Sequence, residues 1–132
     1  MHYLREKLKF IGALGTVFLS GCGSFVPTVS ISNLSEDQRH KIRQVEIFNS
    51  TQIQNKEFKV LTIVEGNSCQ NKLYDPPATR ANAIEQLKFH SLEHGGDGIT
   101  NIQCSGREGT SLRTNCWELI SCTAEVIKFK SK

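Results

Sequence analysis

The chain has 132 residues, a length that corresponds to one small domain with short extensions. Its formal net charge of +3 depends on the N-terminus, because removing Arg5, Lys7, Lys9 and Glu6 from the 16 basic and 13 acidic residues leaves 13 against 12. The charge of a chain processed in this way gives no indication of nucleic-acid binding.

Residues 1–21 have the layout of a bacterial lipoprotein signal peptide. The basic residues precede the apolar run "FIGALGTVFL", which as a helix would cover roughly 15 Å, half of the hydrocarbon core of a bilayer. Such a run predicts a cleaved signal segment rather than a permanent transmembrane helix. It ends in Leu19-Ser20-Gly21-Cys22, which resembles the lipobox in which the cysteine receives a diacylglycerol and becomes the acylated first residue. We therefore expect lipidation at Cys22. The next residue is Gly23 and not Asp, which resembles the pattern of lipoproteins that are sorted to the outer membrane.

Residues 22–44 are mostly polar, contain one proline, Pro27, and predict a tether. As a flexible coil this tether would extend about 25 Å on average and about 70 Å at most. Ser35 and Gln38 match a capping box, which indicates a short helix at its end. We expect the folded domain over residues 45–132.

The first elements of that domain are two strand candidates. They cover 45–48 and 58–66, and the dipeptide Gly66-Asn67 is a turn signal that predicts the end of the second strand. Pro76 and Pro77 exclude regular structure before the next element.

A helix is predicted from about residue 78 to 94. Ala83, Leu87, Ser91 and His94 recur on one face, and Gly95 or Gly96 ends the helix. Strands at 99–104 and 116–129 follow, joined by a polar loop. The order β-β-α-β-β predicts an α+β domain in which one helix packs on a small antiparallel sheet.

With Cys22 lipidated, an even number of cysteines remains: Cys69, Cys104, Cys116 and Cys122. In an exported chain they predict two disulfides. Cys116 and Cys122 are six residues apart in one predicted strand, roughly 20 Å, whereas a disulfide needs Cα atoms within about 7 Å. They cannot bond to each other, so Cys69 pairs with either Cys116 or Cys122, and the spacing does not choose between these pairings.

Several motifs resemble the RcsF family of outer-membrane lipoproteins, which sense envelope damage for the Rcs phosphorelay. The carrying features are the lipobox, "GNSCQ" around Cys69 with the prolines after it, "GGDGITNIQC" up to Cys104, and "CWELISC" from Cys116 to Cys122. The resemblance covers about residues 58–129. It implies that the first of the four cysteines pairs with the third and the second with the fourth, giving Cys69–Cys116 and Cys104–Cys122.

The resemblance also implies a location and partners. The location is the outer membrane, reached through the lipid anchor, with the domain in the periplasm or partly at the surface. The partners are the barrel-assembly machinery, porins and the inner-membrane repressor of the phosphorelay. The tether differs from that of the stress sensors in this family, which is long, basic and proline-rich. The alternative from another class is a structural or adaptor lipoprotein of an outer-membrane complex that does not signal.

Other candidate chemistry is weaker. His90 and His94 are one helical turn apart with Glu93 nearby, but the pattern is not that of a zincin helix, and a solvated helix end is the preferred interpretation. The sequence contains no Cys-x-x-Cys pair, the spacing that would indicate a zinc site. Trp117 is interpreted as a cover for the core, with anchoring of a partner as the alternative. No catalytic set is recognisable, so we expect a binding protein without a cofactor rather than an enzyme.

Overall fold

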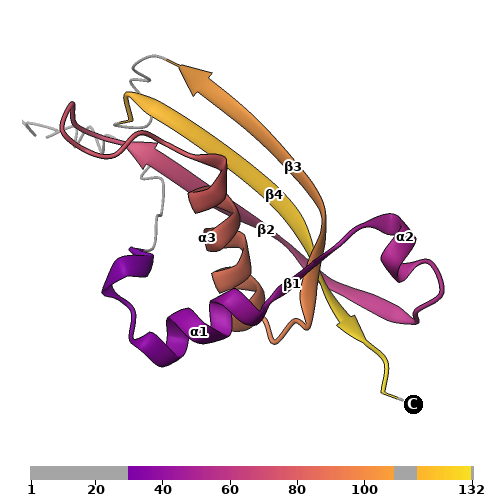
Figure 1. Cartoon of the computed structure of the whole chain (residues 1–132). Helices are drawn as coiled ribbons and strands as arrows, with labels where there is room; N and C mark the ends of the chain where they lie inside the picture. The colour runs from indigo at the N-terminus through magenta and orange to yellow at the C-terminus, as the bar shows by residue number, and fades with distance from the viewer. Residues whose placement is uncertain (1–29, 109–115, 132) are drawn as a thin grey trace, which may run out of the picture.

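The computed structural model describes residues 30–108 and 116–131 (Figure 1). The predicted signal peptide and Cys22 lie outside this range. The elements in chain order are a 3-10 helix η1 (Ile31–Asn33), α1 (Glu36–Gln44), β1 (Glu46–Phe48), α2 (Ser50–Ile53), β2 (Phe58–Gln70), α3 (Arg80–Glu93), β3 (Gly98–Glu108) and β4 (Glu118–Phe129). The predicted order of strands and central helix is confirmed, and so is the α+β class.

The four strands form one sheet in the order β1-β3-β4-β2. β4 pairs antiparallel with both β2 and β3, as expected, but β1 runs parallel to β3, with Glu46 opposite Gly98. The sheet is therefore mixed. The short strand β1 is also attached through a side chain, because the buried hydroxyl of Thr100 donates a hydrogen bond to the carbonyl oxygen of Phe48 at 2.8 Å.

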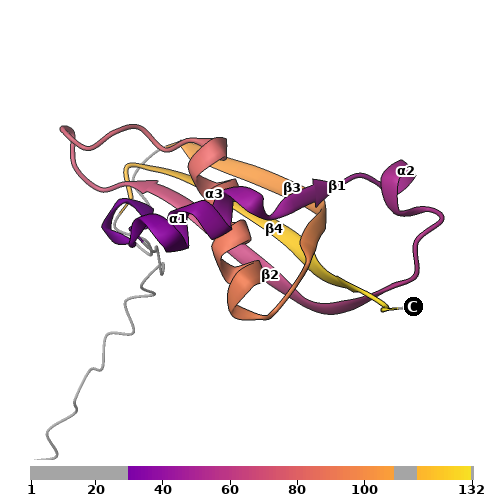
Figure 2. The ribbon, with the colours of Figure 1, turned by 60° about the horizontal axis from the view of Figure 1, so that its bottom comes forward.

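Helix α3 lies across one face of the sheet (Figures 1 and 2). Thr79 caps it by accepting a hydrogen bond from the backbone N–H of Asn82. Ala83, Leu87 and Ser91 are buried as the helical spacing predicts, whereas His94 is exposed at the C-terminal cap and is not part of the buried face. The helix packs on the main core cluster, whose other buried members are Val64, Ile99, Cys122, Ala124 and Val126.

The predicted turn at Gly66-Asn67 is wrong, because β2 continues to Gln70. Gly66 is instead a place where the backbone of α3 approaches the sheet closely. A Cβ atom there would overlap the carbonyl oxygen of Ala83 and would lie 2.8 Å from the backbone nitrogen of Leu87. The glycine is needed for helix packing, a role that glycine also has within strands.

Two irregularities in strand pairing allow more apolar side chains to face α3. The register of β2 shifts between Val60 and Thr62, and that of β3 shifts between Thr100 and Gln103, where Asn101 has a φ of 53°. Residues three apart normally face opposite sides of a strand. Because of the shift in β3, Ile99 and Ile102 both pack on the main core. The shift in β2 likewise lets Leu61 and Val64 both pack on it.

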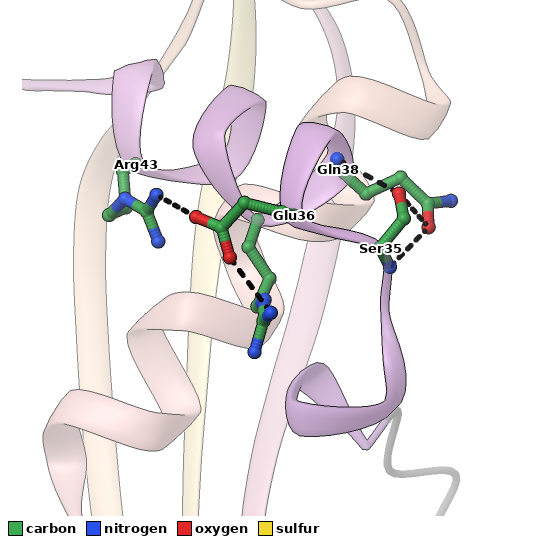
Figure 3. A network of polar contacts seen from close by, with 5 residues as sticks. Ser35, Glu36, Gln38 and Arg43 are labelled. Atoms are coloured by element: carbon green, nitrogen blue, oxygen red, sulfur yellow. Dashed lines mark hydrogen bonds and ion pairs between the residues drawn. The ribbon is translucent and has the colours of Figure 1, made fainter.

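Helix α1 belongs to the folded domain rather than to the tether. The predicted capping box is present, with Ser35 and Gln38 bonded reciprocally, and Glu36 holds the guanidinium of Arg43 at 2.8 Å (Figure 3). Ile42 is only 2% exposed, and α1 lies against α3. The folded region therefore begins before residue 45, the expected start.

Candidate interaction surface

The two disulfides are Cys69–Cys116 and Cys104–Cys122, as the family resemblance implies, with Cα–Cα distances of 5.5 and 4.0 Å. Cys104 and Cys122 are direct neighbours across β3 and β4. Cys116 precedes β4, which begins at Glu118 rather than at residue 116. The first disulfide thus links the end of β2 to the segment that leads into β4, at one end of the sheet.

The loop between β2 and α3 is fastened at the same end. The side-chain amide of Gln70 donates to the carbonyl oxygen of Asp75 at 2.9 Å, and the Asp75 carboxylate accepts from the backbone N–H of Lys72 at 2.9 Å. The backbone N–H of Ala78 donates to Glu118 at 3.1 Å. These bonds join the loop to itself and to β4, so the loop has a defined shape.

Three large hydrophobic side chains are exposed at this end: Leu73 at 70%, Tyr74 at 94% and Trp117 at 53%. The backbone N–H of Trp117 donates to the carbonyl oxygen of Gln70 at 2.7 Å, which holds Trp117 where the loop begins. We call Leu73, Tyr74, Trp117 and the Cys69–Cys116 bridge the disulfide tip. The interpretation of Trp117 as a cover for the core is wrong, because about half of its surface is exposed to solvent.

A groove of about 600 Å³ lies beside the disulfide tip, between α1, α3 and β2. Its lining comes from the N-terminal segment, α1, the end of β2, the loop after it and α3. The lining residues are Ser30, Ile31, Ser32, Arg39, Ile42, Arg43, Asn67, Ser68, Cys69, Asp75, Pro76, Pro77, Asn82, Glu85 and Gln86. The groove exists because α1 is folded onto α3.

Two polar atoms among the groove residues have no hydrogen-bond partner within the described part of the chain. They are Oδ1 of Asn67, a residue that is only 6% exposed, and Nε of Arg39. Buried polar groups are normally paired, and an unpaired one costs about 1–3 kcal/mol. Both atoms are almost inaccessible to solvent, so they lie behind the surface of the groove rather than on it.

The positive charges beside the groove are held by one carboxylate. Glu36 binds Arg39 and Arg43, each at 2.8 Å. The hydrogen bond from Arg43, together with the charge of Arg39, lowers the pKa of Glu36. Glu36 therefore stays ionised at neutral pH and keeps both guanidinium groups at the groove.

The sequence indicated only part of this surface. The capping box predicted α1 but not its packing, and Asn67 was interpreted as a turn residue. His90, one of the metal candidates, pairs with Glu93 at 2.7 Å, while His94 is exposed. Within residues 30–108 and 116–131, no three or more His, Cys, Asp or Glu residues gather in a way that could hold a metal ion.

In the described part of the chain, no helix is both long and apolar enough to cross a membrane. No family model matches the chain, and neither does any curated protein.

Proposed function

We propose that the protein is an outer-membrane lipoprotein, anchored through Cys22, that senses envelope stress by binding other envelope proteins and signals to the Rcs phosphorelay. The lipobox and the family resemblance support the anchor and the pathway. The observation that carries the binding role is the groove of about 600 Å³, whose lining contains both polar and apolar side chains. A binding role needs no acid, base or nucleophile.

The chemistry of the groove suits a polypeptide segment. The exposed side chains of Asn82 and Arg43 in its lining can bond to a peptide backbone, since an amide both donates and accepts hydrogen bonds and a guanidinium donates them. Pro76 and Pro77 add exposed apolar surface to the lining, which matches the mixture of apolar contact and a few placed polar groups that is usual in binding sites. By the family resemblance, the candidate partners are the barrel-assembly machinery, porins and the inner-membrane repressor of the phosphorelay.

Site-specific crosslinking in living cells tests the groove. A photo-reactive amino acid replaces Asn82, which lines the groove, and a matched control replaces Thr51 in α2, which is exposed at the other end of the sheet. We expect an envelope protein to be captured from position 82 and not from position 51. Equal capture from both positions, or none from position 82, would contradict binding at the groove.

A separate experiment tests signalling. Gly23→Asp should retain the lipoprotein in the inner membrane, where the domain meets the repressor directly. We expect a reporter of the phosphorelay to be switched on constitutively. No induction, with the folded protein present in the inner membrane, would refute the signalling role.

One structural observation favours the alternative of a structural or adaptor lipoprotein. Because η1 and α1 belong to the domain, only seven residues lie between Cys22 and Ser30, and the eight steps along the chain can extend about 27 Å at most. A short connection suits a protein that remains within an outer-membrane complex. In that case Gly23→Asp should cause loss of function and no induction.

A further inference from the structure

We propose that the disulfide tip rests on the lipid surface of the membrane to which the protein is anchored. This proposal rests on the lipid anchor at Cys22. It concerns the orientation of the domain and a contact with lipid headgroups, in addition to the binding of envelope proteins at the groove.

The position of the first described residues supports this orientation. Ser30 and Ile31 line the same groove as Cys69 and Asp75, so the chain joins the domain beside the disulfide tip. The eight steps along the chain from Cys22 to Ser30 can span about 27 Å at most. The anchor therefore holds this end of the domain near the bilayer, while α2 and the C-terminus lie at the other end (Figure 1).

The side chains of the disulfide tip suit the boundary between headgroups and acyl chains. Trp and Tyr gather at this boundary because each has an apolar ring and a polar group that remains hydrated. Leu73 adds a purely apolar group, and Lys72 beside it is an exposed cation. Exposed apolar residues gathered at one end of a domain mark an interaction site.

The defined shape of the loop lowers the cost of such a contact. The Cys69–Cys116 bridge and the hydrogen bonds of Gln70, Asp75 and Ala78 hold the backbone in place before any lipid is met. Little conformational entropy is therefore lost from the backbone when the side chains of the disulfide tip enter the interface.

Trp117 is the only tryptophan of the chain and reports directly on this contact. The full lipidated protein is reconstituted into vesicles of phosphatidylethanolamine and phosphatidylglycerol, and the vesicles are collected by flotation. We expect Trp117 emission to shift to shorter wavelength on reconstitution and to fall when part of the lipid is replaced by phosphatidylcholine brominated on its acyl chains.

The variant Leu73→Ser with Tyr74→Ser tests whether the loop makes the contact. Both side chains are exposed, so the fold should be retained, and quenching by brominated lipid should be lost or strongly reduced. The matched control is Ile63→Ser, which removes a 68% exposed apolar side chain of β2 that is not part of the disulfide tip. This control should be quenched like the parent.

The outcomes separate the anchor from the contact. Protein that does not float with the vesicles would refute the anchor and, with it, this proposal. Protein that floats without quenching of Trp117 would overturn the contact while leaving the anchor intact. Protection of Trp117 from acrylamide without lipid quenching would assign the disulfide tip to a second copy of the chain, and equal quenching of the loop variant would also overturn the proposal.

Discussion

Gly66 of β2 lies directly against the backbone of Ala83 in α3, so that a single added carbon at position 66 has no room. The obstructing atoms are mainly backbone atoms of the helix, which cannot rotate away as a side chain can. The distance between helix and sheet therefore depends on this glycine.

Gly66→Ala should destabilise the domain by about 1–3 kcal/mol, the usual cost of overpacking, because α3 must move away from the sheet. Equilibrium unfolding in urea measures the change. The matched control is Gly106→Ala in β3, where an added Cβ would meet nothing within 4 Å. Similar losses in the two variants would show that the close approach at Gly66 is not the cause.

Removing the Cys69–Cys116 bridge by substituting both residues with Ala should lower the free energy of unfolding by about 4 kcal/mol in the chain-entropy model. The Cys104–Cys122 bridge closes a shorter loop, with a sequence separation of 18 instead of 47. It is worth about 3 kcal/mol in the same model, to which a packing loss is added because Cys122 is fully buried. Urea unfolding without reductant tests both variants, and either variant with the stability of the parent would contradict the expectation.

Asp97 should stabilise the domain in a pH-dependent way. Its carboxylate accepts hydrogen bonds from Lys128 Nζ at 2.7 Å and from the backbone N–H of Phe129 at 2.9 Å, and both lower the pKa of Asp97. A lowered folded-state pKa gives stability that is fully present above the unfolded-state pKa and is lost as the pH falls through the folded-state value.

The variant Asp97→Asn should therefore lose about 0.5–1.5 kcal/mol at pH 7. The difference from the parent should shrink below about pH 4, the ordinary range of an Asp carboxyl. Urea unfolding of the two proteins across this pH range measures it. A difference that stays constant down to pH 2 would mean that the charge of Asp97 is not responsible.

Ser35→Ala should loosen α1, since loss of an N-cap side chain costs about 1 kcal/mol. Hydrogen exchange of the amides in α1 should become roughly fivefold faster, which corresponds to that energy. Asn49→Ala removes the equivalent capping box of α2 and serves as the control, because it should affect α2 and leave α1 unchanged. Unprotected α1 amides in the parent would contradict the packing of α1 on α3.

Cys22→Ser should abolish lipid attachment and leave an uncleaved or mislocalised precursor, because the thiol is the acceptor in the lipobox interpretation. Incorporation of radiolabelled palmitate measures it directly. Equal labelling of variant and parent would disprove Cys22 as the site. The four paired cysteines are unavailable for this reaction, since each is in a disulfide.

Most of the secondary structure could be predicted from local patterns in the sequence. The spacing of Ala83, Leu87 and Ser91 identified the buried face of α3, and Ser35 with Gln38 identified the start of α1. These signals are local, because helical periodicity and capping depend on residues only a few positions apart. The even number of cysteines after Cys22 also predicted two disulfides, although spacing alone left two pairings open.

The remaining features depend on contacts between residues far apart in the chain. The dipeptide Gly66-Asn67 is typical of a turn. The structure instead places Gly66 within β2, where α3 packs closely against it. The position of α1 also depends on a distant contact, because α1 packs against α3 and buries Ile42. The groove and the exposure of Trp117 follow from that packing and from the Cys69–Cys116 bridge. Sequence patterns describe which faces are apolar, whereas the tertiary structure decides which faces meet and which stay in solvent.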